Sequence, residues 1–218
     1  MSERGVFITF EGSEGCGKTT QIDLLRVSLE AAGRRVLLTR EPGGTVIGEK
    51  VRHLLQHDAD GEGMFPATEL LLFAASRAQL VREVILPALA EGTVVISDRF
   101  MDSTTVYQGV AREIAADSVA MINQFAVGSC VPDLTFVLDL ESCTALGRIR
   151  ARSSAGEALD RIERESSEFF ERVRAGYLDL VKREPTRTRL LDASLPRETL
   201  AAKILNHVSD LGHGISTI

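Results

Sequence analysis

Residues 12–19 form a segment whose residue types and spacing suit the binding of a phosphate group. They read GSEGCGKT and fit the phosphate-binding-loop pattern G-x-x-x-x-G-K-[ST]. Glycines let the backbone turn so that its N–H groups point inward at phosphate oxygens. We expect Lys18 to reach the outer phosphates of a nucleoside triphosphate, and the Thr19 hydroxyl to ligate Mg²⁺. The candidate triphosphate-binding residues are Gly12, Ser13, Glu14, Gly15, Cys16, Gly17, Lys18, Thr19 and Thr20.

The sequence on either side of this loop supplies the elements that must position it. An apolar run at 6–10 predicts a strand, and the apolar spacing over 22–29 predicts a helix. A helix that starts near Lys18 would add the positive end of its dipole to the phosphate site. The alternative, a chance glycine-rich turn, is disfavoured because strand, turn and helix follow in the order that the pattern requires.

Residues further along the chain distinguish among the reactions that such a loop supports. A guanine-specific switch carries an Asn-Lys-x-Asp element, and neither Asn123 nor Asn206 lies in one. A hydrolytic ATPase commonly ends its acidic strand in Asp-Glu, whereas the apolar strand 93–98 ends here in Asp98 and is followed by Arg99. Asp98 can hold the Mg²⁺ shell, and the cation beside it suits a second phosphate. This pair favours transfer between two phosphorylated ligands over hydrolysis.

Three arginines just after the fourth predicted strand supply more positive charge. Arg148, Arg150 and Arg152 lie within five residues, beside a Ser/Gly loop at 153–156. Arg148 and Arg152 are four residues apart and share one face of a helix. A solvated helix face is the plain alternative. Next to a phosphate-binding loop, the better interpretation is a mobile arginine lid that closes over ATP and excludes water.

The hydrophobic pattern of the whole chain predicts strands alternating with helices, and therefore a parallel sheet covered on both faces in a single α/β domain, 1–218. The predicted strands span 6–10, 36–39, 93–98, 134–140 and 189–192. The predicted helices span 18–33, 48–57, 67–90 with a bend or end near Pro87, 104–108, 118–127, 144–152, 161–184 and 197–209. We expect residues 58–63 to form an exposed loop and residues 211–218 to fray.

Composition limits the class of protein. Of 218 residues, 44% are apolar, which is ordinary for a folded domain, and the net charge of −6 offers no overall footprint for nucleic acid. Three cysteines form no metal-binding spacing and predict reduced thiols. The start of the chain leaves no room for a signal peptide, and no apolar run is long enough to cross a membrane. We therefore expect a cytoplasmic protein with no membrane or nucleic-acid partner.

Seven blocks of sequence, taken together, resemble bacterial thymidylate kinases. They occur in the order typical of that family, and the resemblance extends from residue 6 to residue 192. The blocks are EGSEGCGKTT at 11–20, TREPGGT at 39–45, FAASR at 73–77, DRF at 98–100, YQG at 107–109, PDL at 132–134 and LDRIE at 159–163.

The resemblance implies a fold, a reaction and an assembly. The fold is the P-loop NTPase type, with a monophosphate-binding region at about 40–77 and a lid at about 144–163. The reaction transfers the γ-phosphate of ATP to dTMP, with Mg²⁺ as cofactor. The backbone of Ala193 and Ser194 would cup the adenine ring of ATP. The protein would be a homodimer, for which the apolar helix 67–80 could supply the interface.

The resemblance also implies which residues bind the nucleoside of dTMP. Phe73 would stack on thymine, although a core aromatic is the plain alternative. Arg77 would donate to a thymine carbonyl, the alternative being a solvated arginine. Thr104 would contact the base edge and Gln108 would line the pocket. Tyr107 would exclude a ribose 2′-hydroxyl, or else simply pack under the sheet.

Other residues would then handle the phosphates and the sugar. Arg99 would bind the phosphate of dTMP with help from Arg52, and Glu41 would support them in the dTMP site. Glu14 would accept a hydrogen bond from the sugar 3′-hydroxyl. Gly15 occupies the place where some family members carry a catalytic arginine, so the resemblance implies that the missing charge comes from the lid. The lid candidates are Arg148, Arg150 and Arg152.

Two rival interpretations stay open at this point. One is a kinase for another nucleoside monophosphate or for a deoxynucleoside. The other is a nucleotide-gated binding protein that binds ATP without transferring phosphate. A departure from the family pattern is Cys16, which stands where Ala or Ser is common and would make the loop sensitive to oxidation.

Overall fold

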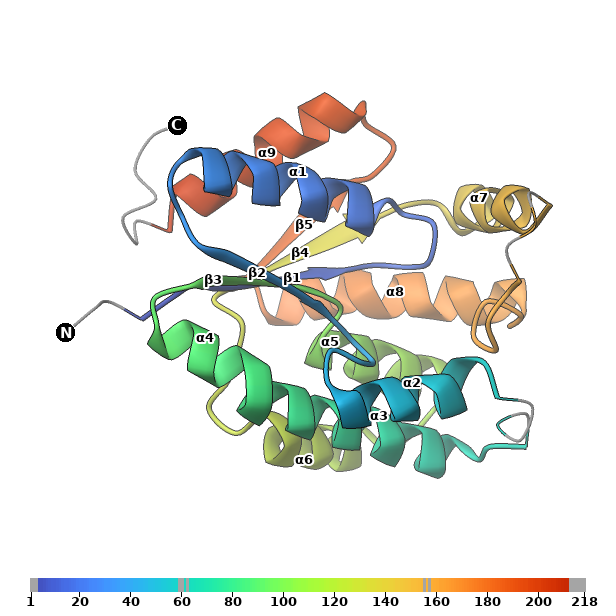
Figure 1. Ribbon diagram of the computed structural model, residues 1–218. Helices are drawn as coiled ribbons and strands as arrows, with labels where there is room; N and C mark the ends of the chain where they lie inside the picture. The colour runs from blue at the N-terminus through green and yellow to red at the C-terminus, as the bar shows by residue number, and fades with distance from the viewer. Residues whose placement is uncertain (1–3, 59–60, 62, 155, 157, 212–218) are drawn as a thin grey trace.

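The structure is a computed structural model that describes residues 4–58, 61, 63–154, 156 and 158–211. Its centre is a five-stranded parallel sheet with strand order β2-β3-β1-β4-β5 (Figure 1). Each predicted strand is confirmed with ends that differ by one residue at most. The strands are β1 Phe7–Glu11, β2 Val36–Arg40, β3 Val94–Asp98, β4 Leu134–Asp139 and β5 Thr188–Asp192.

Helices cover both faces of this sheet. In Figure 1, α1 and α9 lie on one face, and α8, α5 and the group α2, α3, α4 and α6 lie on the other. The helices are α1 Lys18–Ala31, α2 Val46–Gln56, α3 Pro66–Leu80, α4 Leu86–Ala90, α5 Met101–Thr104, α6 Ala116–Val127, α7 Ser142–Ser154, α8 Ser167–Arg183 and α9 Arg197–Ser209. The central strands β1, β3 and β4 are buried on both faces for this reason.

The alternation of side chains along β1 shows how the core divides between the two faces. Ile8 and Phe10 pack with apolar residues of α1 and α9. Phe7 points the other way and packs with Leu80 and Phe100. All five side chains are fully buried. Because side chains alternate along a strand, this packing on both sides fixes the register of β1 between β3 and β4.

Two stretches of π-helix interrupt the helical regions on the second face. The segment Val81–Ile85 is π-helical and joins α3 to α4, so the helix predicted over 67–90 continues through this stretch. Pro87, which has no backbone N–H to donate, lies in the first turn of α4 directly after the π-helical stretch. The segment Thr105–Ala111, between α5 and α6, is also π-helical. Such turns are rare and occur frequently at functional sites.

The region after β4 differs from the prediction. Residues 153 and 154, predicted as loop, belong to α7, while residues 161–165, predicted as helix, form turns. The Asp160 carboxylate accepts hydrogen bonds from the N–H groups of Ile162 and Glu163, and the Glu163 carboxylate accepts from the N–H of Asp160, so this pair caps a turn that is separate from the helix after it. Helix α8 then begins after Ser166, whose hydroxyl caps it by accepting from the N–H of Phe169.

Other boundaries agree with the predictions. Helix α1 ends before Gly33, whose φ of 76° is the left-handed conformation expected of a glycine at that place. Helix α9 has the predicted ends. Most of the predicted frayed tail and parts of the loop 58–63 lie outside the described residues. Among the described residues, no helix is long and apolar enough to cross a bilayer.

Candidate active site

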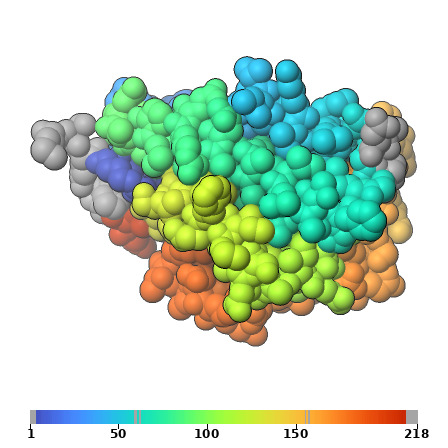
Figure 2. Space-filling model, turned by 90° about the horizontal axis from the view of Figure 1, so that it is seen from below, coloured from blue at the N-terminus to red at the C-terminus, as the bar shows by residue number. Residues whose placement is uncertain are grey.

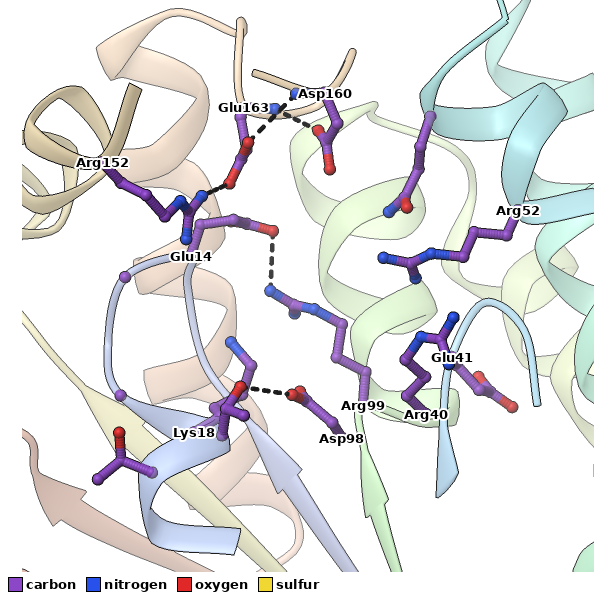
Figure 3. A pocket seen from close by; sticks show the side chains of 15 residues that line it. Glu14, Lys18, Arg40, Glu41, Arg52, Asp98, Arg99, Arg152, Asp160 and Glu163 are labelled. Carbon is purple, nitrogen blue, oxygen red and sulfur yellow. Dashed lines mark hydrogen bonds and ion pairs between the residues drawn. The ribbon is translucent and has the colours of Figure 1, made fainter. Parts of the chain in front are cut away.

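A cavity of about 350 Å³ opens beyond the carboxyl ends of β1, β2 and β3. Figure 3 shows basic and acidic side chains facing one another across it. This is the edge of an open parallel sheet where ligands are expected, because the loops after the strands converge there. The basic residues that line the cavity are Lys18, Arg40, Arg52, Arg99 and Arg152. The acidic residues that line it are Glu14, Glu41, Asp98, Asp160 and Glu163.

The predicted phosphate-binding loop forms one wall of the cavity. Its left-handed conformation at Gly17, with φ of 94°, leads into α1 at Lys18. A Cβ atom at Gly12 would come within 2.6 Å of the Leu138 carbonyl oxygen, so that position requires glycine. The Lys18 ammonium donates to the carbonyl oxygens of Gly12 (3.2 Å) and Ser13 (3.0 Å). The loop therefore surrounds the Lys18 ammonium. When a phosphate binds, its oxygens would replace these carbonyls as acceptors for Lys18.

Cys16 faces away from solvent. Its side chain is 1% exposed and packs in the core on the α1 side of the sheet, with Sγ 3.7 Å from the Lys18 ammonium. Burial at this position shields the thiol from oxidants, because oxidation follows thiolate character and exposure. The expected sensitivity of the loop to oxidation is therefore not supported by the structure.

Thr19 and Asp98 meet at the metal position that the sequence predicts. The Thr19 hydroxyl donates to a carboxylate oxygen of Asp98 across 3.3 Å, and both residues line the cavity. A hydroxyl and a carboxylate are hard oxygen ligands of the kind that Mg²⁺ prefers, with phosphate oxygens and water completing its shell. Within the described part of the chain, no three His, Cys, Asp or Glu side chains cluster to hold a metal without such help. The donor set fits a nucleotide-bound Mg²⁺.

Arg99 stands opposite the phosphate-binding loop. Its φ of 71° is left-handed, a costly conformation for a residue with a side chain and one that is often found at functional sites. The guanidinium donates to Glu14 (2.8 Å), Ser103 (3.1 Å) and Tyr177 (3.3 Å), and lies 5.0 Å from the ring centre of Tyr107. These four contacts hold a cation at the mouth of the cavity, as the sequence predicts.

Glu14, in the phosphate-binding loop, hydrogen-bonds to two residues that follow β3, Arg99 and Tyr107. One carboxylate oxygen accepts from Arg99, and the other accepts from the Tyr107 hydroxyl at 2.7 Å. Burial alone would raise the pKa of Glu14, but the charges of Arg99 and Lys18 lower it below its ordinary value. Glu14 is therefore ionised at neutral pH, and both of its oxygens can accept hydrogen bonds.

A narrow apolar hollow adjoins the cavity and shares Glu14 and Arg99 with it. The structure brings together there four of the five residues predicted to bind the nucleoside. They are Phe73, Thr104, Tyr107 and Gln108. The π-helical stretch Thr105–Ala111 contributes to this arrangement, because its wider turn changes the angular spacing of successive residues along the helix.

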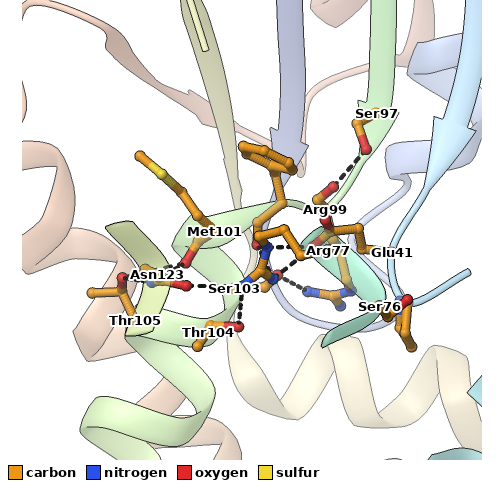
Figure 4. Close-up of polar contacts among 12 residues, drawn as sticks. Glu41, Ser76, Arg77, Ser97, Arg99, Met101, Ser103, Thr104, Thr105 and Asn123 are labelled. Carbon is orange, nitrogen blue, oxygen red and sulfur yellow. Dashed lines mark hydrogen bonds and ion pairs between the residues drawn. The ribbon is translucent and has the colours of Figure 1, made fainter. Parts of the chain in front are cut away.

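Arg77 does not line the hollow. It is 1% exposed, and all five of its N–H donors have protein acceptors (Figure 4). Two bonds go to one Glu41 carboxylate oxygen, at 2.8 and 2.6 Å. The others go to Thr104 (2.9 Å), Asn123 (2.8 Å) and the Phe100 carbonyl (3.2 Å). The structure thus leaves no donor for the expected bond to a thymine carbonyl, and Arg77 instead holds Thr104 and Glu41 in place.

Arg52 and the lid arginines differ in how far they reach into the cavity. Arg52 lines it and donates to the Pro42 carbonyl at 3.0 Å. Arg148 donates to the carbonyl of Gly15 at 3.0 Å, directly beside the phosphate-binding loop. Arg152 lines the cavity and pairs with Glu163. Arg150, like Arg148, is exposed and does not line the cavity, and among the described residues its side chain makes no hydrogen bond to the phosphate-binding loop.

The predicted adenine loop lies apart from the described cavity. Ala193 is buried and its N–H donates to the Asp139 carbonyl at 2.9 Å. The Ser194 hydroxyl and N–H both donate to Asp192, at 2.6 and 2.8 Å. These bonds make a rigid turn at the end of β5, and neither residue lines the cavity.

Known proteins are similar to this chain in sequence and in fold. The profile of the thymidylate kinase family matches residues 10–204. A thymidylate kinase of Geobacter sulfurreducens is 50% identical over 202 residues, which cover 92% of this chain and 94% of that protein. The crystal structure of a thymidylate kinase from Ehrlichia chaffeensis superposes with a TM-score of 0.74 at 32% identity, over 94% of this chain and 99% of that one. The chain belongs to the thymidylate kinase family.

Two acidic residues of this thymidylate kinase family member were not predicted as site residues. Asp160 and Glu163 line the phosphate cavity on its lid side, three residues apart in one turn. They lie in the block LDRIE at 159–163, so the signal was present in the sequence as a pair of acids after the arginine triplet. Glu163 pairs with Arg152 because residues 161–165 fold as a turn. The prediction of a helix over 161–184 did not include that turn.

The lid arginines should separate in a substitution series. Arg148→Ala and Arg152→Ala are each expected to lower kcat roughly 10- to 100-fold, because each removes a cation beside the transferring phosphate. Arg150→Ala should change kcat less than about twofold, since its side chain is exposed and, in the described structure, neither lines the cavity nor bonds to the phosphate-binding loop. Steady-state kinetics with saturating ATP would measure this. A loss in Arg150→Ala as large as in Arg148→Ala would contradict the assignment.

Glu41 is a buried carboxylate on the wall of the phosphate cavity. It is 4% exposed, and its Oε1 atom has no hydrogen-bond partner within the described residues. Burial raises the pKa of Glu41 to about 7, because it outweighs the attraction of Arg77. The acid on this wall therefore titrates near neutral pH.

The raised pKa of Glu41 should appear in the stability of the protein. Between about pH 4.5 and pH 7 the folded state holds one more proton at this site than the unfolded chain, so the free energy of unfolding falls as the pH rises. The whole effect is at most roughly 3 kcal/mol. Urea unfolding at several pH values should show wild type losing stability over this window relative to Glu41→Gln. Parallel pH profiles for the two proteins would contradict it.

Proposed function

We propose that this protein transfers the γ-phosphate of ATP to the 5′-phosphate of dTMP, with Mg²⁺, and releases ADP and dTDP. The observation that carries the proposal is that the phosphate-binding loop and Arg99 face one cavity from opposite sides, joined through Glu14. Two phosphorylated ligands held in this way meet with their phosphates between Lys18 and Arg99. Such transfer asks a protein mainly for positioning and positive charge.

The residues in and beside the cavity have different roles in the transfer of the phosphoryl group. Thr19 and Asp98 would hold Mg²⁺, which would supply positive charge to offset the negative charge of the transferring phosphoryl group. Lys18, Arg99 and the lid residues Arg148 and Arg152 stabilise the charge that spreads over the γ-phosphoryl oxygens. No general base is required, because the phosphate of dTMP is already an anion near pH 7.

The adjoining hollow receives the nucleoside of dTMP. Phe73 stacks on the base, while Thr104 and Gln108 contact its edge. The Tyr107 ring occupies the space that a ribose 2′-hydroxyl would need. Glu14 accepts from the 3′-hydroxyl in exchange for part of its contact with Tyr107. Arg52, from α2, assists Arg99 at the acceptor phosphate.

The lid, the assembly and the location in the cell complete the proposal. We place the monophosphate-binding region at about 40–77 and the lid at about 144–163 within one domain. A homodimer would bury the apolar face where α3 and α6 lie side by side (Figure 2), which exposes 57% of Leu71, 69% of Met121 and 81% of Phe125. Supplying dTDP for nucleotide synthesis places the protein in the cytoplasm.

A coupled assay of ADP release across a panel of nucleoside monophosphates tests the proposed reaction. With ATP and Mg²⁺, dTMP should give the highest kcat/KM, dUMP a lower one, and dCMP and thymidine only background rates. ADP release equal to the dTDP formed would confirm transfer rather than hydrolysis. ATP binding without any ADP release would favour a nucleotide-gated binding protein. Faster turnover of another monophosphate would reassign the acceptor.

A further inference from the structure

Glu69 is a buried acid that the proposed mechanism does not use. It lies in the first turn of α3, is 2% exposed, and accepts hydrogen bonds from three side chains of other segments. Gln108 donates to Oε1 at 2.7 Å, and Arg112 donates to both oxygens at 3.3 and 3.2 Å. Arg161, from the lid side of the cavity, donates to Oε2 at 2.5 Å. The Glu69 carboxylate thus links Gln108, which lines the hollow, to Arg161 on the lid side of the cavity.

These contacts keep Glu69 charged. Burial alone would raise its pKa, but the hydrogen bond from Gln108 and the charges of Arg112 and Arg161 lower the pKa below its ordinary value. An ionised carboxylate has acceptor atoms and no proton to donate. The amide of Gln108 must therefore turn its NH₂ group toward Glu69. The two arginines hold Glu69 in place, so this orientation is maintained.

The orientation of Gln108 determines what the hollow offers to a base. Because one N–H of the amide is donated to Glu69, the carbonyl oxygen Oε1 of Gln108 lies at the other end of the amide, and no hydrogen bond within the described residues uses this oxygen. Thymine and uracil carry an N3–H donor between two carbonyl groups, whereas N3 of cytosine is an acceptor. A fixed carbonyl would bond to the first kind of base and repel the second.

We propose that Glu69 is a positioning residue for base selection, because it fixes the Gln108 amide with its carbonyl available to the N3–H of the base. The idea rests on the proposed function, in which this hollow binds the nucleoside of dTMP. Glu69 itself makes no contact with the base. Arg161 ties the same carboxylate to the turn that carries Asp160, and its Nε donates to the Leu55 carbonyl at 2.9 Å.

Glu69→Gln removes the charge and keeps the shape, so the amide of Gln108 is free to present either end. We expect the ratio of the Kd for dCMP to the Kd for dTMP, measured by calorimetry without ATP, to fall about tenfold. The KM of ATP should stay within about twofold of wild type. In kinetics, the loss for dTMP should appear mainly in KM. Asp139→Asn, which removes a carboxylate paired with Arg174 elsewhere, should leave the ratio unchanged.

A double-mutant cycle tests whether Glu69 acts through Gln108. In Gln108→Leu the ratio should already be low, and adding Glu69→Gln should change it less than about twofold. An equal shift in both backgrounds, or an equal loss of affinity for both nucleotides in Glu69→Gln, would show a merely structural role and overturn the proposal. Wild type that fails to bind dTMP would instead overturn the proposed function. If Glu69→Gln does not fold, Glu69→Asp keeps the charge, shortens the reach to Gln108 and should lower the same ratio.

Discussion

Arg99→Ala is expected to lower kcat/KM for dTMP about 1,000-fold or more, with losses in both kcat and KM. Losing a single donor to a transition-state oxyanion costs about 10² to 10³ in rate, and Arg99 also binds the acceptor phosphate in the ground state. The change also removes the cation that lies 2.8 Å from the Glu14 carboxylate and leaves that partly buried charge with only its bond from the Tyr107 hydroxyl and the more distant charge of Lys18. Steady-state kinetics with varied dTMP would measure the effect, and the KM of ATP should change little.

Two further variants separate these contributions for Arg99. Arg99→Lys keeps a positive charge but loses the planar fork, so it should recover only part of the activity. Arg99→Ala combined with Glu14→Gln removes the unpaired carboxylate and should regain folding stability without regaining activity. An undiminished rate in Arg99→Ala would mean that the acceptor phosphate binds elsewhere. In that case the proposed acceptor site is wrong.

Lys18→Ala is expected to lower kcat roughly 10³-fold or more while the protein stays folded. Lys18 is the only lysine that lines the phosphate cavity in the described structure, and its ammonium already lies among the loop carbonyls that phosphate oxygens would replace. Losing it removes charge at the bridging and outer phosphates, where negative charge develops during transfer. Single-turnover measurements with excess enzyme would separate this loss from any change in product release.

Lys203→Ala provides the matched control for Lys18. Lys203 is exposed on α9, on the face of the sheet away from the base hollow, and its loss should leave kcat unchanged. Lys18→Arg should retain little activity, because the larger guanidinium does not fit among the loop carbonyls. Transfer at the wild-type rate in Lys18→Ala would exclude this loop as the site of the donor phosphates.

The sequence alone was sufficient to predict the elements that depend on local pattern. Apolar runs predicted all five strands, and the phosphate-binding loop was recognisable because its glycines, Lys18 and Thr19 lie within eight residues, 12–19. The cation after β3 was also predicted, since residues that follow parallel strands meet at one edge of the sheet. Each of these inferences needed only short-range spacing.

Only the tertiary structure could decide where the long polar side chains point. Arg77 shares a helix with Phe73 at a spacing of four, yet it turns into the protein because Glu41, Thr104 and Asn123 offer acceptors for its charge. The π-helical stretch that carries Gln108 leaves no signature in hydrophobic periodicity.

The turn at 161–165 and the role of Glu69 also depend on side-chain contacts that only the folded structure shows. The pattern of apolar spacing predicted one helix over 161–184, but Asp160 caps a turn at 161–165 and Ser166 caps a separate helix, α8. Glu69 looks like any acid near a helix N-terminus until Gln108, Arg112 and Arg161 converge on it from positions far along the chain. Such partners become neighbours only when the chain folds, because polar pairing over long sequence separation has no local pattern to reveal it.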